Sequence, residues 1–182
     1  MSESTARRTL CFASKRQFRA LRSALVLEGS AHGREQGAFL FASPAENGAL
    51  RVLDVTVLRR EDFAMQTAYY LELQENVLQE MILHAHSTNT ALVEAHSHPF
   101  TRGPRVRFSP LDCEGLADVG PHVSWRLPGR PYVALVLGWD AFDSLYWEGR
   151  QRGPQGHVDL LVGGQVLRAS RESERFWGEV RG

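Results

Sequence analysis

Two short segments carry the residues best suited to chemistry: Glu-Ala-His-Ser-His-Pro at 94–99 and Ser-Pro-Leu-Asp at 109–112. Two histidines one residue apart, together with an aspartate, can supply three ligands for a zinc ion. His96, His98 and Asp112 are therefore the candidate ligands, and the fourth coordination position is left for water. Zinc lowers the pKa of such a water to about 7, which suits hydrolysis at neutral pH.

The spacing of the histidines predicts how a strand would present them. The apolar run 91–93 is typical of a short strand that leads directly into the histidine pair. Side chains at i and i+2 of a strand point to the same face, so His96 and His98 would face one side together and Ser97 the other. This arrangement brings two imidazole nitrogens to one point without strain.

The third candidate ligand belongs to a different predicted element. Ser109 followed by Pro110, with Asp112 in the first turn, is typical of the start of a helix. Ser109 lies one helical turn before Asp112, so its hydroxyl could stay near the metal and donate to an oxyanion on an attacked carbonyl.

Each pattern also has an ordinary explanation. A lone His-x-His is common by chance, and Ser-Pro-x-Asp needs no metal to explain it. Their order and close spacing, between a strand and a helix, favour a joint metal site. A second pair, His84 and His86, falls at the end of a predicted helix and is interpreted as structural.

A hydrolytic site also needs a carboxylate that accepts and relays a proton, and three glutamates compete for this role. Glu94 precedes His96 by two residues and could share its face of the strand. Glu28 precedes a Gly-rich break, where an exposed helix end is expected. Glu35 is preferred, because a short strand that begins there would run into the core beside the His96 strand.

The composition is that of an ordinary globular protein. Hydrophobic residues make up 43% and charged residues 23% of 182 residues, and the 21 acidic residues balance the 21 basic ones. This balance gives no field that favours nucleic acid, and no apolar run approaches the roughly 18 residues of a membrane span. The start of the chain lacks the apolar core of a secretory signal, and two cysteines make no disulfide framework. A reduced, cytoplasmic setting is expected.

The pattern predicts a polar tail over 1–13 and one α/β domain over 14–182, in which 141–182 forms a less certain C-terminal extension. A helix begins at Ser14, where Ser14 and Gln17 make a capping box, and Gly29, Ser30 and Gly33 are expected to break it. Further helices are expected over 76–84, from 109, and over 170–180. Strands are expected over 37–41, 50–57 (forming a hairpin with the preceding strand), 69–73, 91–93, 132–137, 145–147 and 158–162, with a loop at 59–62.

Together, the two segments and an upstream Glu resemble the JAMM motif of the JAB/MPN metalloproteases, a family of zinc-dependent deubiquitinases and isopeptidases. The resemblance covers roughly residues 14–140. It implies a single MPN/JAB-type domain, in which helices flank a mixed β-sheet in a cytidine-deaminase-like architecture. It further implies zinc held by His96, His98 and Asp112, Glu35 as general base, and Ser109 supporting the tetrahedral intermediate.

The resemblance also implies a substrate. This would be the C-terminal tail of a ubiquitin-like protein or its conjugate, in a bacterial system with E1-like and E2-like conjugation enzymes. Deconjugation and trimming of a sulfur-carrier-protein precursor are both open, as is the oligomeric state. A non-catalytic MPN scaffold is a rival, although such modules usually lack parts of the metal motif that this chain keeps.

One departure from the family pattern concerns loop length. Seven residues usually separate the second His from the Ser, whereas Pro99–Phe108 makes ten. The extra length falls in a Gly/Pro/Arg loop, where insertion costs little. Its residues Arg102, Arg105 and Arg107 are interpreted as a solvated basic turn, with contact to acidic groups of a substrate as the alternative.

Two other zinc families share parts of the pattern. Nucleoside deaminases need a His-x-Glu and a Pro-Cys-x-x-Cys, neither of which occurs here. A DNA-repair family has a similar His-x-His-Pro and Ser-x-x-Asp, but its histidines usually flank Asn, whereas this chain has Ser97.

Overall fold

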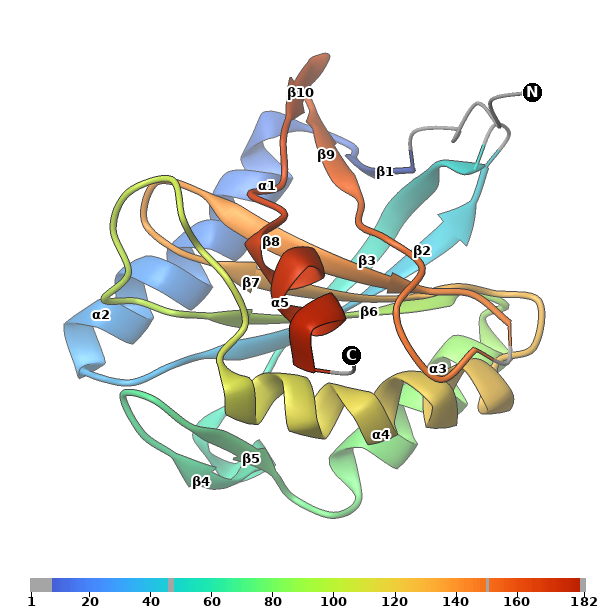
Figure 1. Ribbon diagram of the computed structural model, residues 1–182, viewed down its shortest axis with the longest axis horizontal. Coiled ribbons are helices and arrows are strands. Elements are labelled where there is room, and N and C mark those ends of the chain that lie inside the picture. Colours follow the sequence, from blue (N-terminus) through green and yellow to red (C-terminus); the bar gives the residue numbers. More distant parts are fainter. Residues whose placement is uncertain (1–7, 46–47, 150, 181–182) are drawn as a thin grey trace.

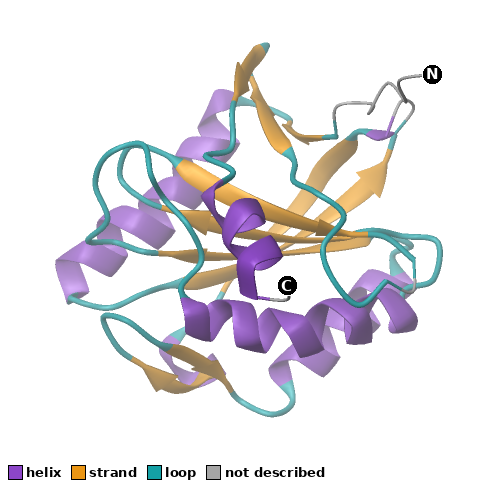
Figure 2. Ribbon diagram, viewed as in Figure 1, coloured by secondary structure: helices purple, strands orange, loops and turns teal. Residues whose placement is uncertain are grey.

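The computed structural model describes residues 8–45, 48–149 and 151–180. They form one α/β domain in which helices flank a curled mixed sheet (Figures 1 and 2). The broad fold class predicted from the sequence is confirmed. Within the described residues, no helix is both long and apolar enough to cross a membrane.

The main sheet has eight strands in the order β10-β9-β1-β3-β2-β6-β7-β8, and β4 and β5 form a separate hairpin. The strands are β1 (Thr9–Phe12), β2 (Gly37–Pro44), β3 (Leu50–Val57), β4 (Phe63–Gln66), β5 (Leu71–Leu73), β6 (Ala91–Ser97), β7 (Tyr132–Leu137), β8 (Phe142–Trp147), β9 (Asp159–Val162) and β10 (Gln165–Leu167). The helical segments are α1 (Lys15–Arg22), the π-helical η1 (Ser23–Leu27), α2 (Glu28–His32), the 3-10 turn η3 (Arg60–Asp62), α3 (Val77–Ser87), α4 (Pro110–Arg126) and α5 (Glu172–Val180).

The central strands are buried on both faces, which explains their nearly continuous apolar runs. Leu40 of β2 and Val93 of β6 belong to the core beneath α1 and η1. Their neighbours Phe39 and Leu92 belong to the second core, on the side of α3 and α4. Figure 1 shows α1 and α2 on one side of the sheet, at the upper left, and α3 and α4 on the other side, below the central strands. Alternate residues of β6 therefore serve opposite faces, and Glu94 and His96 share the face of Leu92.

The first helix begins as predicted. The Ser14 hydroxyl accepts a hydrogen bond from the Gln17 amide at 3.1 Å, and the Gln17 side chain accepts one from the Ala13 amide at 2.9 Å. The first bond makes Ser14 the N-cap, as expected, but the capping box is incomplete, because the Gln17 side chain bonds the amide of Ala13 and not that of Ser14.

The end of this helical run differs from the prediction. Gly29 and Ser30 do not break it, because the helix continues to His32 and ends at Gly33, whose φ is +67°. Gly29 instead permits a close approach: a Cβ there would lie 2.8 Å from the Arg34 carbonyl oxygen and 3.3 Å from the Ser97 hydroxyl.

Both ends of the predicted domain need correction. Thr9–Phe12, expected in the polar tail, is strand β1 and pairs in parallel with β9 and β3. The strand is too short for its alternation to stand out, and its burial depends on partners far along the chain. Residues 1–7 of the expected tail lie outside the described residues. The expected extension over 141–182 supplies β8, β9 and β10 to the same sheet.

Most of the remaining elements follow the predictions with small shifts, but the short strands β4 and β10 were not predicted. The hairpin of β2 and β3 is antiparallel, as expected. The strand expected over 69–73 is shorter and spans Leu71–Leu73, and the loop expected over 59–62 contains η3.

Candidate metal centre

The three candidate ligands meet at one point. His96 lies near the end of β6, His98 immediately follows this strand, and Asp112 lies in the first turn of α4. The two imidazole Nε2 atoms are 3.4 Å apart. Asp112 Oδ2 lies 3.5 Å from Nε2 of His96 and 3.3 Å from Nε2 of His98. Among the described residues, only these three form a cluster suited to hold a metal ion.

The size of this triangle can be compared with a zinc site. With zinc–ligand bonds of about 2.0–2.2 Å, two ligands of a tetrahedron lie roughly 3.3–3.6 Å apart. All three separations, between 3.3 and 3.5 Å, fall in this range. The ligand atoms therefore mark one face of a tetrahedron of the right size, and the donor set of two imidazoles and one carboxylate fits zinc.

Glu35 lies beside this triangle and outside the ligand group. Its Oε1 is 3.6 Å from Nε2 of His98, and only 4% of the residue is exposed. It does not join the group whose ligand atoms all lie within 4.8 Å of one another. Glu35 is thus a buried carboxylate in contact with one candidate ligand but not part of the three-residue cluster.

The pairing of β2 with β6 explains the position of Glu35. The two strands are antiparallel, and Gly37 at the start of β2 is opposite His96. The residues that precede β2 are thus carried to the end of β6 where the histidines lie. The prediction that a strand from Glu35 runs beside the His96 strand is confirmed.

Two residues that the sequence did not single out, Gln66 and Thr67, hold Glu35 in place. The Glu35 amide donates to the Thr67 carbonyl at 2.7 Å, and the Gln66 side chain donates to the Glu35 carbonyl at 2.9 Å. The Ser97 hydroxyl, on the opposite face from the histidines, accepts a hydrogen bond from the Gln36 amide at 3.0 Å. The alternation of β6 predicted the face on which Ser97 lies, but no sequence pattern predicted that residues 66–67 would contact Glu35.

Asp112 is held by the cap of α4. Its Oδ2 accepts a hydrogen bond from the Ser109 amide at 2.7 Å, and the Ser109 hydroxyl accepts one from the Asp112 amide at 3.1 Å. The predicted helix start is confirmed, and the bond to Oδ2 orients the ligand atom, as outer hydrogen bonds do around metals. Because the Ser109 hydroxyl is the acceptor in its cap bond, its own hydrogen remains able to donate.

The ionisable side chains of the cluster shift the pKa values of one another. Burial raises the pKa of Glu35 to about 7, although the charge of His96 opposes this rise. Burial alone would raise the pKa of Asp112, but the charge and hydrogen bond of His96 outweigh it and lower this pKa. Burial likewise opposes protonation of His96, yet Asp112 raises the His96 pKa to about 9. A histidine must lose its proton to ligate a metal, so metal binding here would release protons.

The other two glutamates considered for the base differ from Glu35. Glu28 is exposed at the start of α2. Glu94 shares the face of His96, but its Oε2 accepts a hydrogen bond from the Tyr132 hydroxyl at 2.7 Å. Burial raises the pKa of Glu94. Among the ion pairs of the described residues, only that of Glu35 joins one of these three glutamates to a candidate ligand.

The long loop between His98 and Ser109 folds back on the domain. The Arg102 guanidinium lies 4.5 Å from the ring centre of Trp139, and the Phe108 ring packs 5.5 Å from that of His96. The three arginines interpreted as a solvated basic turn, Arg102, Arg105 and Arg107, are all exposed, and Arg102 is also stacked on Trp139.

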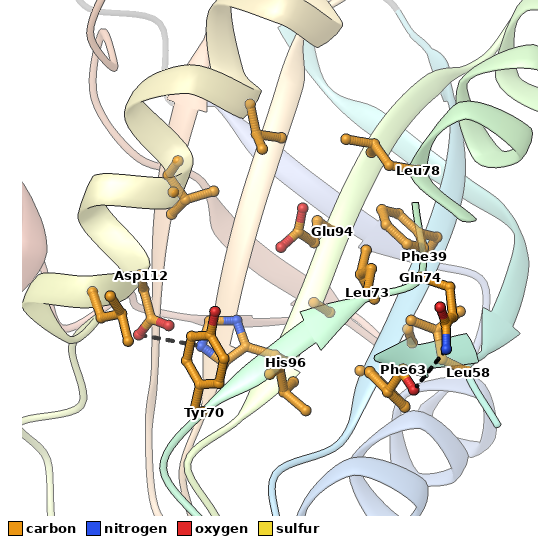
Figure 3. A pocket seen from close by; sticks show the side chains of 18 of the residues that line it. Phe39, Leu58, Phe63, Tyr70, Leu73, Gln74, Leu78, Glu94, His96 and Asp112 are labelled. Carbon is orange, nitrogen blue, oxygen red and sulfur yellow. Dashed lines mark hydrogen bonds and ion pairs between the residues drawn. The ribbon is translucent and has the colours of Figure 1, made fainter. Parts of the chain in front are cut away.

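A pocket of about 590 Å³ adjoins the cluster, and His96 and Asp112 form part of its wall (Figure 3). The other walls come from β2, the β4–β5 hairpin, the start of α3 and one face of α4. A substrate group that occupies this pocket would therefore lie next to the candidate ligands.

Comparisons with known proteins do not assign a family to the chain: no protein-family model matches it, and no curated protein matches it.

Proposed function

We propose that this protein is a zinc-dependent isopeptidase or peptidase of the JAB/MPN type, with His96, His98 and Asp112 as ligands and Glu35 as general base. One observation carries the proposal: the three ligand atoms are spaced as one face of a zinc tetrahedron, with a buried carboxylate 3.6 Å from His98. A structural zinc site would be closed by a fourth protein ligand, whereas this arrangement leaves one position open.

The roles of the residues follow from their positions. When bound, zinc would polarise the scissile carbonyl and lower the pKa of water. Glu35 takes a proton at its carboxylate from the attacking water and later returns it to the leaving amine. The Ser109 hydroxyl donates to the oxyanion that develops on the carbonyl. Phe108, packed against His96, limits access of bulk water from that side.

For the substrate, we propose the extended C-terminal tail of a ubiquitin-like protein, either conjugated or as a precursor, in a bacterial system with E1-like and E2-like enzymes. The motif resemblance supports this substrate, and the pocket offers a site for one of its side chains. We propose a cytoplasmic location, in keeping with the free thiols of Cys11 and Cys113.

The first experiment measures zinc per chain by elemental analysis. We expect about one zinc ion in the protein, and loss of zinc in His98→Ala and in Asp112→Asn. The asparagine variant keeps a side chain that can accept the Ser109 hydrogen bond, so zinc loss there is separated from loss of the helix cap. A protein that binds no zinc even after its addition would support the scaffold interpretation instead.

The second experiment measures cleavage of ubiquitin-like fusions and conjugates. Glu35→Gln is expected to keep zinc and to lose cleavage by a factor of about 10² or more, because proton transfer is removed. Glu28→Gln, at the exposed start of α2, is the matched control and should cleave normally. A Glu35→Gln protein with normal turnover would contradict the assignment of the base.

A further inference from the structure

The walls of the pocket beside the metal centre are largely apolar. Phe39 of β2 and Phe63 of β4 lie on one side, with Leu73 of β5 and Leu78 of α3 beside them (Figure 3). Leu116 and Val119 of α4 close the opposite side. Such walls favour an aliphatic chain over a polar one.

The charges around this pocket all have one sign, apart from the candidate ligand His96. Glu75, Glu114 and Asp118 are exposed and line the pocket, and Glu94 and Asp112 lie further in. Among the described residues that line it, none is a lysine or an arginine. The pocket is therefore both apolar and anionic.

Glu94 is the carboxylate with the clearest need for a counter-charge. Figure 3 shows its side chain directed into the pocket, between the side of Asp112 and that of Phe39 and Leu78. The Tyr132 hydroxyl bonds one carboxylate oxygen, and the described residues provide Glu94 with no ion pair. A carboxylate withdrawn from bulk water is costly unless a cation or further hydrogen bonds compensate it.

From these observations we infer that the pocket binds a basic side chain of the substrate, an arginine or a lysine close to the scissile bond. Its aliphatic stem packs against the apolar walls and its cationic head pairs with Glu94, since long basic side chains combine both properties. The acidic residues at the mouth favour entry of a cation and disfavour acidic residues. That the occupant belongs to a substrate rests on the proposed function.

The position of Glu94 relates this basic residue to the reaction. Glu94 and His96 lie two residues apart on one face of β6, which separates their Cα atoms by roughly 7 Å. A side chain whose head reaches Glu94 thus keeps its own backbone next to the metal ligands. The pocket would then select the residue beside the bond that is cleaved.

The test measures peptide binding without cleavage. Four fluorescent pentapeptides differ at one central position, which holds arginine, lysine, norleucine or glutamate. Their dissociation constants are measured by anisotropy with the Glu35→Gln protein, both zinc-loaded and metal-free. We expect the arginine and lysine peptides to bind about fivefold or more tightly than norleucine, and the glutamate peptide to bind weakest.

The additional change Glu94→Gln should abolish this preference, because it removes the charge but can still accept the Tyr132 hydrogen bond. Glu61→Gln, an exposed change outside the pocket, is the matched control and should keep the preference. Equal affinities for arginine and norleucine, or no binding of the arginine peptide at millimolar concentration, would overturn the inference. If the arginine and lysine peptides bind more tightly than norleucine but the protein with Glu35 intact cleaves no substrate, the result would support the pocket and contradict the proposed hydrolysis.

Discussion

The Ser173 hydroxyl accepts a hydrogen bond from the Phe108 amide at 2.9 Å, across 65 positions of sequence, and both groups are buried. Phe108 packs against His96 and immediately precedes the cap of α4. The Ser173 amide itself donates to the buried carboxylate of Asp143 at 2.8 Å. The C-terminal segment therefore fixes the loop that leads from the histidines to Asp112.

The first prediction concerns this contact. Ser173→Ala leaves the buried Phe108 amide without an acceptor, which should lower the free energy of unfolding by about 1–3 kcal/mol. Because the loop positions Asp112, zinc affinity should fall about 10-fold or more, as for other outer-shell changes. Urea unfolding and competition with a chelating dye measure the two effects. Ser87→Ala, exposed on α3, is the control, and equal zinc affinities in both variants would contradict the positioning role.

The second prediction compares two glycines of α4. A Cβ at Gly120 would lie 2.5 Å from the buried Trp147 ring, whereas a Cβ at Gly115 would meet nothing within 4 Å. Gly120→Ala should therefore destabilise the protein by about 1–3 kcal/mol through overpacking. Gly115→Ala should instead stabilise it by up to about 1 kcal/mol, because alanine favours the helix. Thermal unfolding of both variants decides the matter, and similar midpoints would disprove the close packing of α4 on β8.

The third prediction concerns metal and stability. An ion that binds only the folded protein stabilises it by an amount that grows with the ratio of free metal to Kd, about 2.7 kcal/mol at a hundredfold excess over Kd. Added zinc should raise the thermal midpoint of the protein, and a chelator should reverse the rise. The midpoint of His98→Ala should not respond to either addition. A response in that variant equal to that of the original protein would place the zinc elsewhere.

The fourth prediction is a loss of stability at alkaline pH. Burial raises the pKa of Tyr146 and raises that of Tyr132 well above the usual value of about 10. In the unfolded chain these phenols ionise near pH 10, while in the fold they stay protonated. Above pH 10 the folded state therefore binds more protons than the unfolded state. Ionisation of these phenols leaves the free energy of unfolding unchanged below pH 10 and lowers it as the pH rises further. Cys113, whose pKa burial raises to about 12, acts in the same direction.

Urea unfolding at pH 9, 10 and 11 tests this expectation. The chain has one lysine, Lys15, and its other cationic side chains are arginines that keep their charge, so few other groups titrate in this range. Tyr146→Phe should reduce the dependence on pH by removing one of the two phenols. A free energy of unfolding that stays constant from pH 9 to 11 would contradict the burial of both hydroxyls.

The sequence by itself determined the features that depend on neighbours along the chain. The spacing of His96 and His98 with the cap at Ser109 was enough to propose three ligands, because strand alternation and helix capping are local. The structure brings those ligand atoms together at 3.3–3.5 Å. The same local rules predicted the N-cap at Ser14.

Sequence patterns were less reliable for glycine, which can either end a helix or permit close packing inside one. Gly29 was expected to end a helix, since glycine lowers helix propensity. Gly29 instead lies inside the helix, where the absence of a side chain leaves room for the Arg34 carbonyl and the Ser97 hydroxyl. Only the packed structure distinguishes these two reasons for a glycine.

Tertiary structure alone decided what surrounds the ligands. The pairing of β2 with β6 sets Glu35 beside His98, and the bond from Phe108 to Ser173 joins the loop to the C-terminal segment. Likewise, Thr9–Phe12 became a strand only because β3 and β9 lie on either side of it. These contacts join residues far apart in sequence, and their stability comes from burial and hydrogen bonds that exist only once the sheet is assembled.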